Sequence, residues 1–564
     1  MHPITARTVL SRWWNGVRAS KRDTQQRFIP AVFDTETCFG FVFATGFFDG
    51  EKLRIHYGDK RNHARWFLDQ VKSLPISHGT AVVASHFLIF DLSVLFWKLI
   101  NPGGYKPAKA PKRSYFSVLE PRCTIEIFWG RPCFGFIRFG NKTIHLVDTY
   151  AYYGMSLSRA LRAIGAKEKK LKKPANLGRR IIPLSELHPY LAADCHGDFA
   201  LLEDILNRHR EFLIPLCVSA PMMAGKIFRR HFMKKDFAKP SAELRTAGLL
   251  SYHGGKNGFY AKPGWHKKAW DLDINSAYAE AMFQLPNFSA GRWRRGSGMG
   301  FVRKFPHGVY RIEGTYRACT WGSLFSHDFK RLETGRIRPT WVTGYELLES
   351  IRSGEFTPSS VLGFGFQEKK KAPESPFKAY IKHWFEIKRT TTNKAFREFA
   401  KHMLTDLYGK FIARIEEEET GDMVAGSMFD PAIASLITGF VRARIHRLEH
   451  KYRAIHTATD GFITQNRPDP LDIGSGLGQL KQETFGPVLI LRNKLYLHYD
   501  GEGRLRKTGL HGFELGPEKL LRLWKSADRT YRVERLVRFA EAWGIDLPPG
   551  APKWIKKRLN LVGV

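Results

Sequence analysis

The sequence predicts a multidomain chain that combines α/β and α+β folds. Its 564 residues exceed what one hydrophobic core usually holds and correspond to three to five domains. Two β-rich runs, Ile29–Phe33 and Ala269–Leu272, lead into acidic residues, whereas apolar residues recur at helical spacing after Ser375. The composition, 43% hydrophobic and 13% aromatic, can bury several cores and argues against a disordered chain.

The charge balance indicates a polyanionic partner. Lys and Arg total 90 against 53 Asp and Glu, which gives a formal net charge of +37 that is spread along the chain. Arg and Lys also interleave with aromatic residues, as in Arg292–Arg295 and Trp554–Arg558. This pattern favours nucleic acid over the alternative, an anionic membrane surface.

Cysteine usage and hydropathy exclude several classes of protein. Six scattered cysteines without a CxxC pair indicate a reducing compartment and argue against a zinc ribbon or a disulfide frame. The most apolar stretch, Ala81–Ile100, is interrupted by charged residues, so we expect no membrane span. We expect a cytoplasmic monomer, with the basic residues 1–28 contacting nucleic acid; a transit-peptide-like leader is the alternative for them.

The stretch Ala269–Met282, which reads AWDLDINSAYAEAM, is the centre of the prediction. It begins as an apolar strand that ends in Asp273. A carboxylate at the end of a buried strand is costly unless a positive group faces it. A metal ion would satisfy this requirement, and it needs at least one further carboxylate from elsewhere in the chain.

A second set of acids lies in the first third of the chain. Asp34 and Glu36 follow a β-rich run and, by the two-residue period of a strand, point to the same side. Asp91 stands in an apolar context, and Tyr190 and Asp194 share a helix face at i, i+4. Taken singly, these residues also fit an exposed strand edge, a helix cap or an amphipathic helix.

In this order they resemble the three exonuclease motifs of the DnaQ-like, RNase H-like proofreading domain of family B DNA polymerases. The resemblance implies four carboxylates that hold two metal ions: Asp34, Glu36, Asp91 and Asp194. Tyr190 would orient the attacking water. Ser156 and Leu157 match single-strand DNA contacts and Lys172 matches the catalytic lysine, whereas Phe87 replaces the usual Asn of the second motif.

The glycines of Tyr252–Gly258 allow close backbone approach to a ligand, although a plain turn is an equal alternative. This segment resembles the YxGG motif that joins the two halves of protein-primed family B enzymes. The resemblance implies contacts with DNA from three residues: Tyr252, Gly254 and Gly255.

The stretch that opens at Asp273 resembles polymerase motif A. Asp273 would then be a metal ligand, and Tyr278 would pack under the incoming sugar and reject a 2′-hydroxyl. Ala277 and Ala279 replace the usual Leu and Pro.

Two faces are predicted for the helix before Phe411. The apolar stripe consists of Phe396, Phe399, Met403, Leu407 and Phe411, and the mainly basic face of Lys394, Arg397, Lys401, Thr405 and Tyr408. Lys401–Phe411 resembles motif B of the protein-primed enzymes, so Lys401 would bind nucleotide phosphates and Tyr408 would line the nascent pair. Lys388 and Arg389 are further phosphate-binding residues in this interpretation. Thr405 and Asp406 stand where Asn and Ser are usual.

The segment Ala454–Thr464 has the pattern of a β-hairpin with Asp-Gly at its turn. It resembles motif C, in which Asp460 matches the acid that directly binds metal, whereas Ala458 replaces the other. Asp460 is therefore the expected partner of Asp273. Lys494 and Tyr496 match the KxY motif that holds the primer.

The resemblance implies an N-terminal exonuclease domain and a right-hand polymerase domain. The expected parts are a basic extension (1–28), the exonuclease domain (29–235), the YxGG linker and first part of the palm (236–286), an insertion that resembles a terminal-protein region (287–374), the fingers (375–412), the rest of the palm (413–500) and a helical, basic thumb (501–564).

The expected function is template-directed DNA synthesis with 3′–5′ proofreading, with two Mg²⁺ or Mn²⁺ ions per site, dNTP substrates and a DNA template and primer. Protein priming by a terminal protein, an ordinary primer and primer-independent initiation all stay open. Two alternatives also stand: an exonuclease with a degenerate polymerase half, and a non-catalytic nucleic-acid scaffold.

Overall fold

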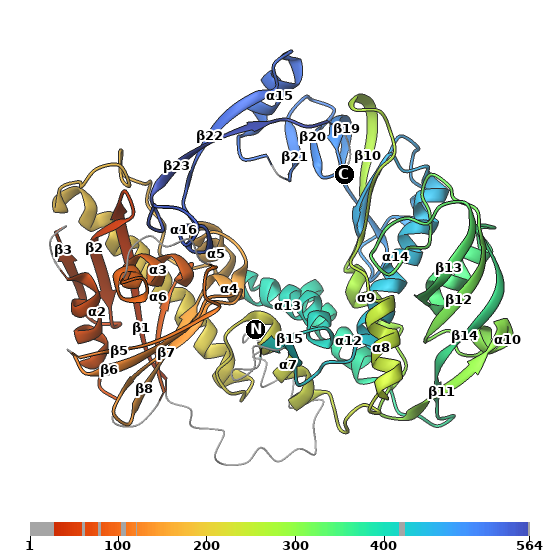
Figure 1. Ribbon diagram of the computed structural model, residues 1–564, viewed down its shortest axis with the longest axis horizontal. Coiled ribbons are helices and arrows are strands. Elements are labelled where there is room, and N and C mark those ends of the chain that lie inside the picture. Colours follow the sequence, from red (N-terminus) through yellow and green to blue (C-terminus); the bar gives the residue numbers. More distant parts are fainter. Residues whose placement is uncertain are drawn as a thin grey trace. The chain divides into compact units, whose positions relative to one another are not determined.

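The protein is described by a computed structural model that covers residues 28–58, 62–76, 80–102, 109–119, 121–416, 423–511 and 513–561 (Figure 1). The extension expected at 1–28 lies outside the described residues except for Phe28. Two compact units are present. The first comprises the chain up to Ile227 with Thr391–Phe399 and Glu534–Ile555, and the second comprises Phe228–Thr390, Ala400–Val533 and the chain from Lys556. Both units combine sheets with helices, so the predicted fold class is confirmed.

The first unit is built on one mixed sheet. In its described part the strand order is β3-β2-β1-β4-β8-β7-β6-β5, with β1 parallel to β4 and β4 parallel to β8. The strands are β1 (Phe28–Cys38), β2 (Phe41–Phe48), β3 (Leu53–Tyr57), β4 (Thr80–Ser85), β5 (Arg113–Val118), β6 (Cys123–Phe128), β7 (Phe134–Phe139) and β8 (Lys142–Asp148). The expected acidic pair lies on β1, inside this sheet rather than at its edge.

Helices cover this sheet and close its core. They are α2 (His63–Lys72), α3 (Leu88–Ile100), α4 (Tyr150–Tyr153), α5 (Leu157–Ile164), α6 (Leu184–Glu211), α7 (Ala220–His231, which continues into the second unit) and α16 (Phe539–Ala542). The fully buried Phe33 of β1 packs against Phe67 of α2, with ring centroids 4.5 Å apart. Helix α6 packs against β1 and places Tyr190 and Asp194 beside the acidic end of that strand.

The second unit contains a sheet of order β21-β20-β19-β10-β18-β17-β9 in its described part. The strands are β9 (Lys256–Phe259), β10 (Gly264–Ile274), β17 (His456–Thr459), β18 (Gly461–Thr464), β19 (Leu480–Arg492), β20 (Leu495–Tyr499) and β21 (Leu505–Leu510). Strand β10 is internal and pairs antiparallel with both β18 and β19. The hairpin predicted over Ala454–Thr464 is formed by β17 and β18.

The segment expected as an insertion folds as a second, antiparallel sheet of order β11-β14-β12-β13. Its elements are β11 (Gly291–Ser297), α10 (Gly298–Lys304), β12 (Gly308–Tyr316), β13 (Gly335–Thr343), α11 (Gly344–Arg352) and β14 (Phe356–Glu368). Tyr310, Ile312 and Leu347 lie in its core, so this segment folds although its sequence has only weak hydrophobic periodicity.

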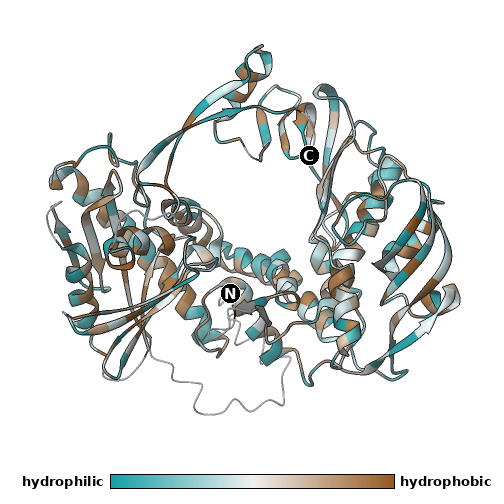
Figure 2. Cartoon of the chain, viewed as in Figure 1, coloured by the Kyte–Doolittle hydropathy of each residue, from teal (hydrophilic) through white to brown (hydrophobic). Residues whose placement is uncertain are grey.

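Helices and short elements complete the second unit. They are α8 (Ala242–Ser251), α9 (Ala277–Phe283), α12 (Pro376–Thr390), α13 (Lys394–Asp406, shared with the first unit), η2 (Tyr408–Phe411), β15 (Arg414–Glu416), β16 (Met423–Ala425), α14 (Pro431–Tyr452) and η3 (Pro470–Asp472). Helix α14 is buried along most of its length and is capped by Asp430, whose side chain accepts from the amides of Ala432 and Ile433. Hydrophobic and hydrophilic residues are mixed along the helices and strands of both units (Figure 2).

The expectation of a helical segment at 501–564 is wrong. Besides β21, this part contains α15 (Pro517–Lys525), β22 (Thr530–Leu536), the short α16 and β23 (Pro552–Arg558). In β22, Tyr531 and Val533 are buried while Arg532 between them is exposed, which is the two-residue period of a strand.

Candidate active sites

The structure brings Asp273 and Asp460 to neighbouring strand ends of the second unit. Asp273 pairs in register with Gly461, and the Ile274 amide donates to the Asp460 carbonyl at 3.0 Å. A Cβ placed on Gly461 would lie 2.8 Å from Asp273 Oδ1, so glycine leaves room for this carboxylate. Two acids that are far apart in the sequence are thereby adjacent, as the hairpin prediction requires.

The electrostatic environment of this pair favours a bound cation. Burial and, to a smaller extent, the neighbouring Asp460 together raise the pKa of Asp273 to about 7. Burial also raises the pKa of Asp460. Both side chains offer only oxygen, the donor that Mg²⁺ and Mn²⁺ prefer, and a divalent cation would relieve their repulsion. The donor set therefore fits such an ion.

A third acid, Asp271, lies two residues earlier on β10 and was not identified from the sequence. Lys507 Nζ lies 2.8 Å from its carboxylate and His498 Nδ1 lies at 3.9 Å. Although burial acts in the opposite direction, His498 and Lys507 hold the pKa of Asp271 below its usual value. The same i, i+2 spacing that drew attention to Asp34 and Glu36 would have found it.

The YxGG segment lies against the hairpin that carries Asp460. A Cβ on Gly255 would come within 2.4 Å of the Thr459 side chain, whereas one on Gly254 would meet nothing within 4 Å. Arg442 Nη1 donates to the Gly254 carbonyl at 3.0 Å. Tyr252 raises the pKa of Tyr408 electrostatically, after the larger effect of burial, so it also lies nearby.

Two predicted nucleotide-site residues are in direct contact. The rings of Tyr278, on α9, and Tyr408, at the start of η2, stack with their centroids 4.4 Å apart. Lys388 Nζ donates to Asn275 Oδ1 at 3.1 Å and to Ser276 Oγ at 2.9 Å, which places this lysine beside the turn that follows Asp273.

Of the other predicted residues, Lys494 and Tyr496 lie near the Asp273–Asp460 pair. Burial raises the pKa of Asp460 and Lys494 opposes this rise, whereas burial and, to a smaller extent, Asp273 raise the pKa of Tyr496. Arg389 pairs with Glu386 on the same exposed helix face, at 3.0 Å. Lys401 is exposed on α13. The Lys494 amide donates to His456 Nε2 at 3.1 Å, and Tyr496 is buried in the sheet, with 8% of its surface exposed.

The first unit gathers a second carboxylate set. Oxygens of Asp34, Glu36 and Asp194 lie within 4.8 Å of one another. Burial and neighbouring acids raise the pKa of Asp34 well above its usual value and the pKa of Glu36 to about 8. The buried Asp194 Oδ1 has no hydrogen-bond partner among the described residues. An orphaned oxygen within a repelling carboxylate set fits a divalent cation.

Asp91 supports this set from α3. Its side chain is 2% exposed and accepts from the Thr35 hydroxyl at 2.6 Å and from the Ser85 hydroxyl. Burial raises its pKa to about 7, even though these hydrogen bonds act in the opposite direction. Because Asp91 also raises the pKa of Asp34, the two carboxylates are close neighbours.

The lysine that is hydrogen-bonded to Asp194 is Lys170, which corrects the expectation of Lys172. Lys173 also lies near this set, because it opposes the raised pKa of Glu36. Lys170 Nζ donates to Asp194 Oδ2 and lies 5.1 Å from the centre of the Tyr190 ring. Although burial opposes it, Asp194 raises the pKa of Lys170 and keeps this lysine charged. Lys172 is exposed. Four lysines within five residues, Lys169, Lys170, Lys172 and Lys173, left the sequence without a signal to separate them.

The single-strand positions have mixed surroundings. Phe87 is 41% exposed, has a positive φ of 80°, and its amide donates to Asp148 at 3.0 Å. Ser156 is exposed just before α5, whereas Leu157 is buried in a hydrophobic cluster. Asp198, a buried acid that the sequence analysis missed, accepts from the His86 amide at 2.8 Å.

Comparisons with known proteins agree with this picture. Residues 166–425 match the family model described as DNA polymerase type B, organellar and viral. None of the curated proteins is similar enough to count as a match. Across the described ranges, no helix has both the length and the apolarity needed to cross a membrane.

Solved structures with the same fold include Phi29 DNA polymerase in three complexes. The complex with primer-template DNA and incoming nucleotides gives a TM-score of 0.68 at 16% identity, covering 94% of this chain and 100% of that chain. The complex with single-stranded DNA gives 0.66 at 16% identity with the same coverage. The binary complex with primer-template DNA gives 0.65 at 17% identity, again with the same coverage. At these identities the likeness shows the fold.

Proposed function

We propose that this chain, whose residues 166–425 match the family model of the organellar and viral type B DNA polymerases, is a member of that family and a template-directed DNA polymerase with a 3′–5′ proofreading exonuclease. Synthesis is assigned to the second unit and proofreading to the first. The Phi29 enzyme of the same fold is seen with primer-template DNA, incoming nucleotides and single-stranded DNA, which supports the same classes of ligand here.

In the polymerase site, Asp273 and Asp460 would hold two divalent cations, Mg²⁺ or Mn²⁺. Such ions lower the pKa of the attacking primer 3′-hydroxyl and neutralise charge on the nucleotide phosphates. The chain itself positions these carboxylates: Asp273 lies on β10, and Asp460 lies in the turn that leads into β18, the strand paired with β10. Lys507, held by Asp271, stabilises their negative charge from the side, because it opposes the increase in pKa of both acids.

The stacked pair Tyr278 and Tyr408 would form the floor of the nucleotide pocket. Tyr278 is held by its stacking partner and by burial, so its ring cannot turn away from an incoming sugar without losing that contact. Lys388 and the exposed Lys401 would bind the triphosphate from α12 and α13. A DNA strand would pass over the glycines at 254 and 255.

In the exonuclease site, Asp34, Glu36, Asp91 and Asp194 would hold the cations. The chemistry supplied by two such ions is activation of water and stabilisation of the leaving 3′-oxygen. Lys170 fixes Asp194 through a charge-assisted hydrogen bond and lies under the Tyr190 ring. Tyr190 would then orient the attacking water with its hydroxyl.

The observation that carries the proposal is the adjacency of Asp273 and Asp460. Asp273→Asn and Asp460→Asn are expected to abolish extension of a labelled primer on a template and to leave degradation of single-stranded DNA intact. Asp34→Ala should have the opposite effect. Primer extension that persists in both polymerase-site variants, with metal and dNTPs present, would refute the assignment.

A second candidate, an exonuclease with a weakened polymerase half, is favoured by one observation. Ala458 stands on β17 where relatives carry another acid, and it pairs with Gly461 beside Asp460. Extension far slower than degradation would select this candidate. Ala458→Asp should then raise extension, because it adds a carboxylate next to the pair.

Initiation is the part of the proposal that concerns a partner. We propose that the enzyme starts on a protein hydroxyl supplied by a terminal protein. This choice is supported by the resemblance of Tyr252–Gly258 and Lys401–Phe411 to motifs of protein-primed enzymes and of residues 287–374 to a terminal-protein region. Labelled nucleotide, template and the enzyme, with and without a primer oligonucleotide, would be resolved on a denaturing gel. Long products without primer and without a second protein would refute protein priming.

A further inference from the structure

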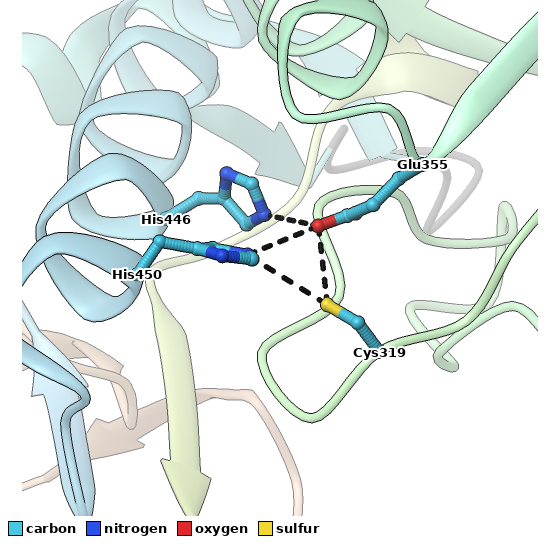
Figure 3. Close-up of side chains that lie close together, drawn as sticks. All are labelled: Cys319, Glu355, His446 and His450. Atoms are coloured by element: carbon cyan, nitrogen blue, oxygen red, sulfur yellow. Dashed lines mark hydrogen bonds and ion pairs between the residues drawn. The ribbon is translucent and has the colours of Figure 1, made fainter.

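Four side chains with metal-binding atoms converge in the second unit. Their described contacts do not include Asp273 or Asp460. The four side chains are Cys319, Glu355, His446 and His450, and their ligand atoms all lie within 4.8 Å of one another. Figure 3 shows two imidazoles from one helix, a thiol from a loop and a carboxylate from the start of a strand pointing to a common centre. Neither the nucleotide nor the DNA chemistry proposed above uses any of them.

The distances fit a small tetrahedral site. Glu355 Oε1 lies 2.7 Å from His446 Nε2, 3.1 Å from His450 Nε2 and 3.1 Å from Cys319 Sγ, and Cys319 Sγ lies 3.7 Å from His450 Nε2. Ligands around tetrahedral zinc, at bond lengths of about 2.0–2.3 Å, are separated by about 3.5 Å. The three Glu355 contacts would reach this spacing if each lengthened by less than about 1 Å.

Surrounding contacts orient these ligands. Glu355 Oε2 accepts from the Ser323 amide at 2.9 Å and from the Tyr316 hydroxyl at 3.1 Å, which leaves Oε1 facing the cluster. His446 Nδ1 lies 3.4 Å from Glu349, a carboxylate that is itself paired with two arginines. A carboxylate behind a metal-binding imidazole fixes its tautomer and strengthens its basicity.

The donor set also identifies the ion. One thiolate and one carboxylate carry two negative charges, and two neutral imidazoles carry none, so a dication would be neutralised. Thiolate and imidazole select zinc over Mg²⁺ and Ca²⁺, which prefer oxygen. We propose that Cys319, Glu355, His446 and His450 bind one structural Zn²⁺ ion.

The place of this cluster in the fold suggests what the ion stabilises. His446 and His450 lie in the last two turns of α14, and the chain enters β17 and the turn with Asp460 a few residues later. Trp321, on the same loop as Cys319, donates to the Ala454 carbonyl at 2.9 Å. The ion would clamp the end of α14 to this loop and to the start of β14, and so hold the base of the hairpin.

The sequence held only half of this signal. His446 and His450 have the i, i+4 spacing that puts two imidazoles on one helix face, whereas Cys319 and Glu355 are distant and lie in no metal-binding pattern. Only the tertiary structure brings Cys319 and Glu355 to the two histidines.

The test uses the full-length protein, purified, loaded with ZnCl₂ and dialysed, with zinc measured by mass spectrometry. About one equivalent is expected in the unsubstituted protein, and Cys319→Ser and His450→Ala should each lose it. Both side chains are partly exposed, so folding should survive, and circular dichroism checks this. His327→Ala, an exposed histidine of the same segment, is the matched control and should retain the ion.

A second readout separates this site from the carboxylate sites. Cobalt in place of zinc should show thiolate-to-cobalt charge-transfer absorption in the unsubstituted protein and in Asp34→Ala and Asp273→Ala, but not in Cys319→Ser. Absence of this absorption in the unsubstituted protein would overturn the proposal. Equal zinc content in the unsubstituted protein, Cys319→Ser and His450→Ala would overturn it as well, whatever the polymerase activity.

Discussion

The ring of Tyr278 stacks on the ring of Tyr408 with 4.4 Å between the centroids and 9° between the planes. One tyrosine follows strand β10, which carries Asp273 next to its last residue, and the other follows helix α13, so two expected motifs meet in one contact. Stacked aromatic contacts of this kind add about 0.5–1.5 kcal/mol beyond the burial of area. Each ring therefore holds the other in position beneath the proposed site of the nucleotide sugar.

Replacing the first ring tests this assignment. Tyr278→Val is expected to raise incorporation of ribonucleotides relative to deoxynucleotides on the order of 10- to 100-fold, because a bulky group that blocks the 2′-hydroxyl is removed. Tyr278→Phe retains the ring and should retain the discrimination. The measurement is single-nucleotide extension with matched ATP and dATP; equal discrimination in Tyr278→Val and the unsubstituted enzyme would contradict it.

The paired glycines provide a test with an internal control. Gly255→Ala would place a Cβ 2.4 Å from the Thr459 side chain and 3.0 Å from its Cα, so the turn that carries Asp460 must move. We expect primer extension to fall by about 100-fold, as misplacement by about 1 Å does elsewhere, with exonuclease activity unchanged. Gly254→Ala meets no protein atom within 4 Å and leaves this turn in place, so extension should fall far less than in Gly255→Ala, even though the added methyl group lies where DNA is proposed to pass. Equal extension by the two variants would argue against a tight contact here.

Replacing Lys170 tests whether the exonuclease activity can be lowered without a change in primer extension. Lys170→Met removes the charged partner of Asp194 and the cation beside Tyr190, so degradation of single-stranded DNA should fall about 10- to 100-fold. Extension with a nuclease-resistant primer should not change. Lys172→Met, which replaces an exposed lysine, is the control. A larger loss of exonuclease activity in Lys172→Met than in Lys170→Met would show that Lys172 is the lysine that acts in this site.

Stability should depend on pH through the cap of helix α14. Burial raises the pKa of Asp430 to about 6, against the lowering effect of its hydrogen bonds to the Ile433 and Ala432 amides. Because the folded pKa lies above the unfolded value, the folded state binds the proton more tightly, and stability decreases as pH rises from about 4 to about 6. Asp430→Asn keeps an accepting oxygen but cannot ionise.

The measurement is the free energy of unfolding of both proteins in denaturant from pH 4 to 8. Relative to the unsubstituted protein, Asp430→Asn should gain up to about 3 kcal/mol between pH 4 and 7, since one pKa unit corresponds to about 1.4 kcal/mol. A difference that stays constant over this range would show that the Asp430 carboxylate is not perturbed.

Local sequence patterns predict many of the elements that carry the two candidate sites. A strand that ends in an acid, an i, i+4 pair and an Asp-Gly turn are each written in a few consecutive residues, and β1, α6 and the β17–β18 hairpin follow them. The strands of 501–564 were missed because a two-residue period over seven residues is easily lost among Lys and Arg.

The sequence by itself determined the order of Asp34, Asp194, Asp273 and Asp460 and the strand, helix or turn that carries each, because these local patterns are contained in a few consecutive residues. Only the tertiary structure decided which distant groups meet them: Lys170 rather than Lys172 at Asp194, Lys507 at Asp271, and the thiol, carboxylate and imidazoles around Glu355. The physical reason is that periodicity acts over a few residues, whereas these partners are joined by sheet register and helix packing across long stretches of chain.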